Sequence, residues 1–173
     1  VKWGHLQDNP ARGVDLRVNA NPSLLREGRP TMAEQEAAKG PLPIVPFLKI
    51  PAAGSPHLEA QRCKGCAAIF LGERSSCSKC GARDTLEAFP LSSHGHLYVY
   101  SIVHRSFPGV EVPYISCIVD LEGGGTVKGN LIGIEPNPAK IKMGMPVETV
   151  FKIAPRKDAA GSEYLTYYFQ PRS

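Results

Sequence analysis

Four cysteines gather between residues 63 and 80, and their spacing is that of a metal site. Cys63 and Cys66 form one C-x-x-C pair, and Cys77 and Cys80 form a second pair after a short loop. Each pair can make a tight turn that points two sulfurs at one place, and a hairpin between them can bring the two turns together. Zinc accepts four thiolates tetrahedrally, with Zn–S distances of about 2.3 Å. The pattern predicts a zinc ribbon whose metal is structural, because four protein ligands leave no position for a reactive water.

Other uses of these cysteines are less consistent with the sequence. A redox C-x-x-C is expected near a βαβ pattern, which is not seen around either pair. A disulfide framework is disfavoured by the odd total of five cysteines and by the lack of a signal sequence at the start. Thiolate ligands without an export signal predict a reducing, cytoplasmic location. The fifth cysteine, Cys117, lies in an alternating apolar stretch and is predicted to be a buried, inert thiol.

Composition limits the protein class. The chain has 173 residues, of which 42% are hydrophobic, so it can bury a core. The 17 glycines and 16 prolines favour short strands and loops over long helices. No apolar run approaches the roughly 18 residues of a membrane span, so no membrane association is predicted. A net charge of +4 permits an anionic ligand without requiring nucleic acid.

The chain after the cysteines has an all-β pattern. Five segments rich in β-branched and aromatic residues are predicted strands: 97–104, 114–121, 126–134, 146–153 and 164–169. Glycines 123–125 are expected to form a hairpin turn, and His94 and His96 a polar turn where the first strand begins. Five strands, with a longer connection between the third and the fourth, predict an OB-fold barrel.

The predicted organisation has three parts. Residues 1–56 form an N-terminal extension or partner-binding arm, residues 57–90 the zinc ribbon, and residues 91–173 the OB-fold. In the extension, capping residues predict short helices at 22–28 and 32–39. The proline-rich stretch 41–51 is expected to run extended. Its apolar residues either pack on this protein's own core or lie along a partner subunit, and the sequence leaves both possibilities open. The fold class is therefore mainly β.

Several motifs occur in an order that is typical of one family. They are the four-cysteine ribbon, GHLYVYSIVHR (95–105), PGVEVPY (108–114), VDLEGG (119–124), GNLIG (129–133) and KMGMPVETVF (142–151). From about residue 58 to 171 the chain resembles the rubredoxin-like zinc-ribbon plus OB-fold proteins, a family long described as a domain of unknown function. Ala67 departs from the glycine that is common after the first cysteine pair, and the N-terminal extension is longer than the family's usual lead.

The resemblance implies an auxiliary role. Members of the family accompany thiolases and related acyl-CoA enzymes, and they shape the acyl-CoA channel without supplying catalytic residues. It implies a thiolase-fold enzyme subunit as the partner and a coenzyme A thioester as the ligand of the complex. An example is the benzylsuccinyl-CoA thiolase of aromatic degradation. The alternative within the family is a partner of a steroid side-chain, lipid-transfer-protein-like aldolase.

Candidate contacts to coenzyme A or to the partner lie in two predicted loops. OB barrels bind ligands on one face and with the loops that follow strands one and four. Arginine and lysine suit the phosphates of coenzyme A, and an aromatic side chain on a polar loop often anchors an interface. The candidates are His104, Arg105, Phe107, Arg156 and Lys157.

Two further classes of function are disfavoured. The sequence has no H-E-x-x-H, G-x-S-x-G or phosphate-binding glycine motif, so the chain alone is not predicted to be an enzyme. Binding of single-stranded nucleic acid is a second hypothesis, since OB-folds do this elsewhere. It needs a basic groove with stacking aromatics. The predicted second and third strands have Tyr114 and Lys128 but are otherwise mostly apolar, which makes nucleic acid an unlikely partner.

Overall fold

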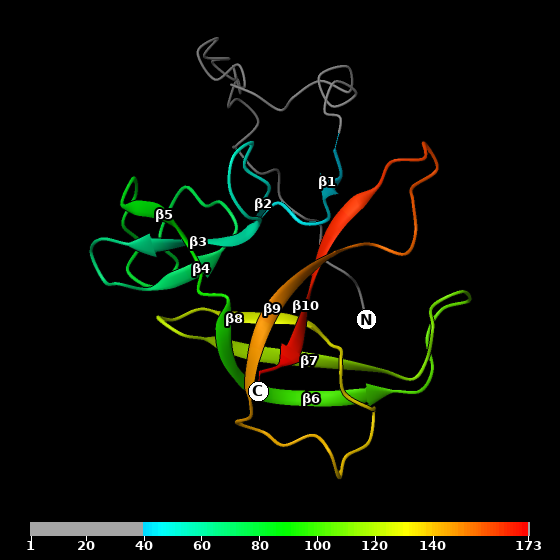
Figure 1. Ribbon diagram of the computed structural model, residues 1–173. Coiled ribbons are helices and arrows are strands. Elements are labelled where there is room, and N and C mark those ends of the chain that lie inside the picture. The colour runs from blue at the N-terminus through cyan, green and yellow to red at the C-terminus, as the bar shows by residue number, and fades with distance from the viewer. Residues whose placement is uncertain (1–39, 173) are drawn as a thin grey trace, which may run out of the picture. The chain divides into compact units, whose positions relative to one another are not determined.

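The computed structural model describes residues 40–172, shown in colour in Figure 1. The helices predicted at 22–28 and 32–39 lie outside the described residues. Within residues 40–172 all regular elements are strands, which confirms the mainly β class. This part of the chain has no helix of the length and apolar character needed to cross a membrane.

Five strands close into a barrel (Figure 1). Strand β7 pairs antiparallel with both β6 and β8; β10 lies beside β8 in parallel and beside β9 antiparallel, and β9 returns to β6. This closure is the OB topology, so the predicted barrel is confirmed. The bounds are β6 His94–Val103, β7 Tyr114–Leu121, β8 Thr126–Leu131, β9 Pro146–Ile153 and β10 Tyr164–Pro171.

Strand β6 begins at His94 and not at Leu97, so the expected polar turn at His94 and His96 is wrong. Both histidines are paired in the sheet, and β6 contacts β7 and β9 at the same residues. Gly95 makes this possible, because a Cβ at that position would lie 2.4 Å from the carbonyl oxygen of Asp120. The glycine therefore allows β6 to lie close to β7. The two histidines beside it made a turn the expected structure.

The cysteine region is a small antiparallel sheet. Strand β3 (His57–Cys63) pairs with β4 (Ile69–Leu71) and with β5 (Leu86–Pro90). Residues after β4 reach the second cysteine pair, where Ser76 and Arg83 form an isolated bridge. The boundaries drawn at residues 56 and 90 stay a prediction, because one apolar cluster includes side chains from both sides of residue 90.

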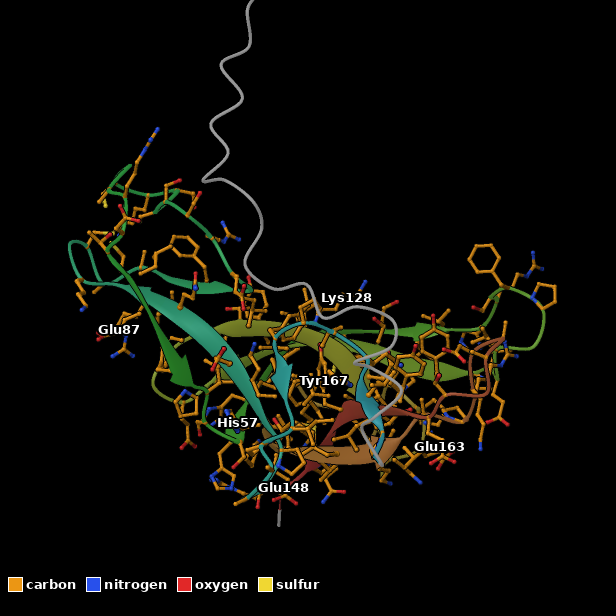
Figure 2. The ribbon with its side chains drawn as sticks, turned by 90° about the horizontal axis from the view of Figure 1, so that it is seen from above. His57, Glu87, Lys128, Glu148, Glu163 and Tyr167 are labelled. Atoms are coloured by element: carbon orange, nitrogen blue, oxygen red, sulfur yellow. The ribbon has the colours of Figure 1, made fainter. Side chains whose placement is uncertain are left out.

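The stretch 41–51 joins both sheets, but the prediction that it runs extended throughout is wrong, because residues 44–47 form a turn in which Leu48 N–H donates to the Val45 carbonyl at 3.1 Å. Strand β1 (Leu42–Pro43) pairs in parallel with β10, and β2 (Leu48–Lys49) pairs with β3. Leu48 is fully buried, and the ring of Phe47 lies 6.1 Å from that of Tyr167, which Figure 2 labels. Most of this stretch therefore packs on the chain's own core, while Ile44 and Ile50 stay exposed.

The barrel core is centred on Phe169, whose side chain is fully buried. Gly129 of β8 leaves room for it, since a Cβ there would lie 2.7 Å from the Phe169 ring. The turn at glycines 123–125, predicted from the sequence, has positive φ at all three residues. It also seats the ribbon: a Cβ on Gly124 would lie 2.6 Å from Ile69 of β4, and Arg62 donates a hydrogen bond to the Gly123 carbonyl at 3.3 Å.

Candidate metal centre and barrel groove

The four cysteine sulfurs converge on one point. The Sγ atoms of Cys63, Cys66, Cys77 and Cys80 all lie within 4.8 Å of one another. Cys63 and Cys80 are 3.7 Å apart, and Cys66 and Cys77 are 3.5 Å apart. A tetrahedron with Zn–S bonds of about 2.3 Å places its sulfurs about 3.8 Å apart, whereas a disulfide requires about 2.05 Å. None of the four cysteines is in a disulfide. The donor set therefore fits a single zinc ion.

The two cysteine pairs are presented by the same backbone turn. In the first, Ala67 N–H donates to the Cys63 carbonyl at 2.8 Å, and Cys63 N–H donates to the Ala68 carbonyl at 2.9 Å. In the second, Gly81 and Ala82 make the equivalent contacts with Cys77. Each turn needs a residue at positive φ: 56° at Ala67 and 74° at Gly81. The first turn thus forces alanine into a conformation that glycine adopts without steric cost.

A polar neighbour favours the thiolate form of Cys63. Thr85 Oγ1 lies 3.4 Å from Cys63 Sγ, and this hydroxyl is the main cause that lowers the pKa of Cys63 to about 6. The basic side chains beside the ligands make other contacts. Arg62 stacks on Phe89 at 4.5 Å, and Lys64 forms an ion pair with Glu87 at 3.2 Å.

A groove of about 1120 Å³ lies along the outer face of the barrel, under the loops that follow β6 and β9. Its cationic side chains are Lys128 of β8, Lys152 of β9 and Arg156 of the β9–β10 loop. One carboxylate, Glu111, also lines it. Its half-buried apolar lining includes Ile132 and Ile134, so the groove combines an apolar base with an excess of positive charge.

Of the five loop residues predicted to contact ligand or partner, Arg156 alone lines this groove. Lys157 is in an ion pair with Glu163 at 2.9 Å. His104 and Arg105 are exposed in the β6–β7 loop, and Phe107 is 84% exposed. The roles assigned to these residues stay predictions, and the structure divides them between a groove and an outer loop surface.

Sequence analysis missed Lys152 and Tyr168 as groove residues. Both lie within predicted strands, and those strands were predicted from their apolar core positions. The signal was available: a charged residue on a half-buried strand must point away from the core, and period-two alternation identifies the side that it faces. What alternation could not show is that the β8 and β9 cations flank one groove.

Asp158 organises the loop that holds Arg156. Its Oδ1 accepts hydrogen bonds from the backbone N–H groups of Ala160 at 2.9 Å and Ser162 at 2.8 Å, and its Oδ2 accepts one from the Tyr164 hydroxyl at 2.9 Å. These bonds, that from Ser162 first, lower the pKa of the carboxyl below its usual value. The loop is therefore shaped by its own aspartate before any ligand arrives.

Two buried groups stand apart from both sites. Cys117 is buried in the barrel, and this burial raises the pKa of its thiol to about 11. Thr149 of β9 is buried, and its hydroxyl has no hydrogen-bond partner in the described part of the chain. The expected burial of Cys117 is thus observed.

Comparison with known proteins identifies the family. Residues 52–87 match the rubredoxin-like zinc ribbon domain of ChsH2, and residues 89–152 match the C-terminal OB-fold domain of ChsH2. A DUF35 domain-containing scaffold protein of Methanocaldococcus jannaschii is 33% identical over 112 residues, which span 64% of this chain and 78% of the relative. The chain belongs to the DUF35 family of zinc-ribbon and OB-fold proteins. The resemblance inferred from the motifs is confirmed.

Two further similarities are to proteins of named enzyme complexes. The subunit BbsA of the benzoylsuccinyl-CoA thiolase of Geobacter metallireducens is 33% identical over 76 residues, which span 43% of this chain and 51% of that subunit. Among solved structures, the Ltp2-ChsH2(DUF35) aldolase matches with a TM-score of 0.53 and 29% identity. It covers 66% of this chain and 84% of the matched chain.

Proposed function

We propose that this protein is a zinc-binding, non-catalytic subunit of an enzyme that cleaves or forms a carbon–carbon bond in an acyl-CoA substrate. The similarity to a thiolase subunit and to a chain of an aldolase complex is the observation that supports this role. In this role the four cysteines hold one structural zinc, which fixes the ribbon against the barrel. The barrel then presents its groove to the active site of a larger thiolase-fold subunit.

The groove suits one end of a coenzyme A thioester. Coenzyme A has a diphosphate and a 3′-phosphate, which charged hydrogen bonds from arginine and lysine bind strongly. Lys128, Lys152 and Arg156 supply such donors above an apolar floor. The groove exceeds the roughly 300–1,000 Å³ of typical ligand pockets, so it can take a long ligand in part. We infer that these side chains hold phosphate while the acyl group enters the partner.

The substrate class follows from the chemistry of thiolysis. A thiolase breaks the bond between the α and β carbons when a ketone stands at the β carbon, and the thiol of a second coenzyme A takes up the released acyl group. A benzoylsuccinyl group has that ketone, whereas a benzylsuccinyl group lacks it. A β-ketoacyl-CoA of the benzoylsuccinyl type therefore replaces the benzylsuccinyl-CoA expected from the sequence.

An aldolase partner is the second candidate, favoured by the structural match to the Ltp2-ChsH2 complex. An aldolase cleaves the same bond in a β-hydroxyacyl-CoA and releases an aldehyde or ketone without consuming a thiol. The two candidates can be distinguished by assaying the native complex, purified from its host through a tag on this chain. Thiol-dependent cleavage of a β-ketoacyl-CoA supports the thiolase, and thiol-independent cleavage of a β-hydroxyacyl-CoA supports the aldolase. A complex with neither activity contradicts the proposal.

The groove has its own test. Reversing Lys152 and Arg156 to glutamate removes two cations and adds two anions, so KM for the acyl-CoA is expected to rise by tenfold or more while zinc content stays constant. Lys142→Glu is the matched control, because Lys142 is exposed and does not line the groove. An equal KM for wild type and the double variant would remove the groove from coenzyme A binding.

A further inference from the structure

The loop between β6 and β7 exposes an apolar cluster. Residues 104–113 project beyond the ends of both strands (Figure 1). Phe107 is 84% exposed, Val110 43% and Val112 44%. A Phe side chain is large enough to contribute strongly to binding when it is buried, and contiguous exposed apolar groups on a soluble domain mark contact surfaces.

A hydrogen bond and packing against a neighbouring loop define the conformation of this loop. Val110 N–H donates to the Phe107 carbonyl at 3.1 Å and closes a turn around Gly109, whose φ is 81°. The Arg156 guanidinium from the β9–β10 loop packs on Gly109, where a Cβ would lie 3.1 Å from its Cζ. Asp158 holds that second loop in place through its own hydrogen bonds. Phe107 is therefore presented by two mutually supporting loops, which lowers the entropy cost of docking.

The charges around the cluster have one prevailing sign. Arg105 lies in the β6–β7 loop and the Arg156 guanidinium packs on that loop at Gly109, while Glu111 is the opposing carboxylate. In the neighbouring loop the charge of Lys157 is balanced by Glu163, and the oxygens of Asp158 accept hydrogen bonds from Ser162 and Tyr164. A complementary partner surface has an apolar pocket for Phe107 and a carboxylate opposite Arg105, which leaves Arg156 available to the groove.

The same loop has a second face. Ser106, Gly109 and Val110 line the groove, whereas Phe107 does not. A protein seated on Phe107 would therefore contact the loop that forms one side of the groove.

We propose that the β6–β7 loop, with Phe107 as its anchor, docks into an apolar pocket of the catalytic subunit that has a carboxylate facing Arg105. The inference rests on the proposed function for the identity of the partner. It adds the surface that is used, the residue that anchors it and the sign of the charge that faces it.

The test compares tagged full-length variants expressed in the host, with the co-purified thiolase-fold or aldolase subunit quantified against the tagged chain. Phe107→Ala and Val110→Ser are expected to weaken retention, with Phe107→Ala raising Kd by roughly tenfold or more, as buried aromatic anchors do. Arg105→Glu should lower the association rate and reverse its dependence on salt. Met143→Ser is the matched control, because Met143 is 70% exposed but lies on the β8–β9 connection.

The outcomes distinguish the surface from the function. If wild type retains the catalytic subunit and Phe107→Ala retains it equally, the docking surface is wrong while the proposed function stands. If wild type retains no such subunit, the proposed function is wrong and the docking proposal has no partner. Equal losses for Met143→Ser and Phe107→Ala would show a general effect of apolar surface and would also overturn the proposal. Zinc content and unfolding midpoint, unchanged in every variant, establish that each one is folded.

Discussion

Within residues 57–90 the buried apolar side chains are few: Leu58 and Ala60, together with the sulfurs of Cys63 and Cys77. The barrel instead buries a large set contributed by all five strands, which includes Leu97, Ile115, Val119, Val127, Leu131, Val147, Leu165 and Phe169. Burial of apolar area can stabilise the barrel, whereas a sheet as small as the ribbon buries too little to order its loops. The difference indicates that the metal replaces a hydrophobic core in the ribbon.

Removing the metal is the strongest test of this contrast. Cys63→Ser with Cys80→Ser is expected to abolish zinc binding and disorder the ribbon, since structural zinc supplies on the order of 10–16 kcal/mol in small sites. Because Leu58 and Ala60 belong to the same apolar cluster as the barrel core, loss of the ribbon should also leave the protein prone to aggregation. Metal analysis and circular dichroism measure both effects. A soluble, zinc-free double variant with native spectra would refute the contrast.

A core truncation tests the barrel. Phe169→Ala removes the largest fully buried side chain, and such changes cost about 3–5 kcal/mol. The unfolding midpoint in urea should fall sharply, while the folded fraction still binds one zinc per chain. Loss of zinc from the native variant would instead mean that the ribbon depends on the barrel for its metal affinity.

The smallest effect concerns the two cysteine turns. Ala67→Gly should stabilise the holoprotein by about 0.5–1 kcal/mol. Alanine at the required positive φ costs roughly 1–2 kcal/mol, which glycine does not have. Part of this gain is lost because glycine has more conformational freedom in the unfolded chain. Gly81→Ala is the reciprocal variant and should destabilise by a similar amount, since no atom lies within 4 Å of its added Cβ. Denaturant unfolding of zinc-loaded protein measures the change in unfolding free energy of both variants. Changes of the same sign would contradict a cause in the positive φ of the turns.

The strands and the cysteine ligand set were predictable because they rest on local patterns. Alternation of apolar residues marks a strand wherever it occurs in the chain, and C-x-x-C spacing defines a turn within a few residues. The predicted five strands and the convergence of the four sulfurs follow from such patterns. The error at His94 and His96 has the same origin: a polar dipeptide around a glycine is typical of a turn, and only pairing with two strands at once shows why Gly95 is there.

The sequence by itself determined the mainly β class, the order of ribbon and barrel, and the four sulfur ligands, since each depends on residues close together in the chain. Only the tertiary structure decided that residues 42–43 pair beside β10, that Lys128 and Lys152 join Arg156 along one groove, and that Lys157 forms an ion pair with Glu163. These facts depend on barrel closure, which brings β8, β9 and β10 together from distant positions. Closure geometry depends on the whole set of strand pairings, and no single stretch of sequence records it.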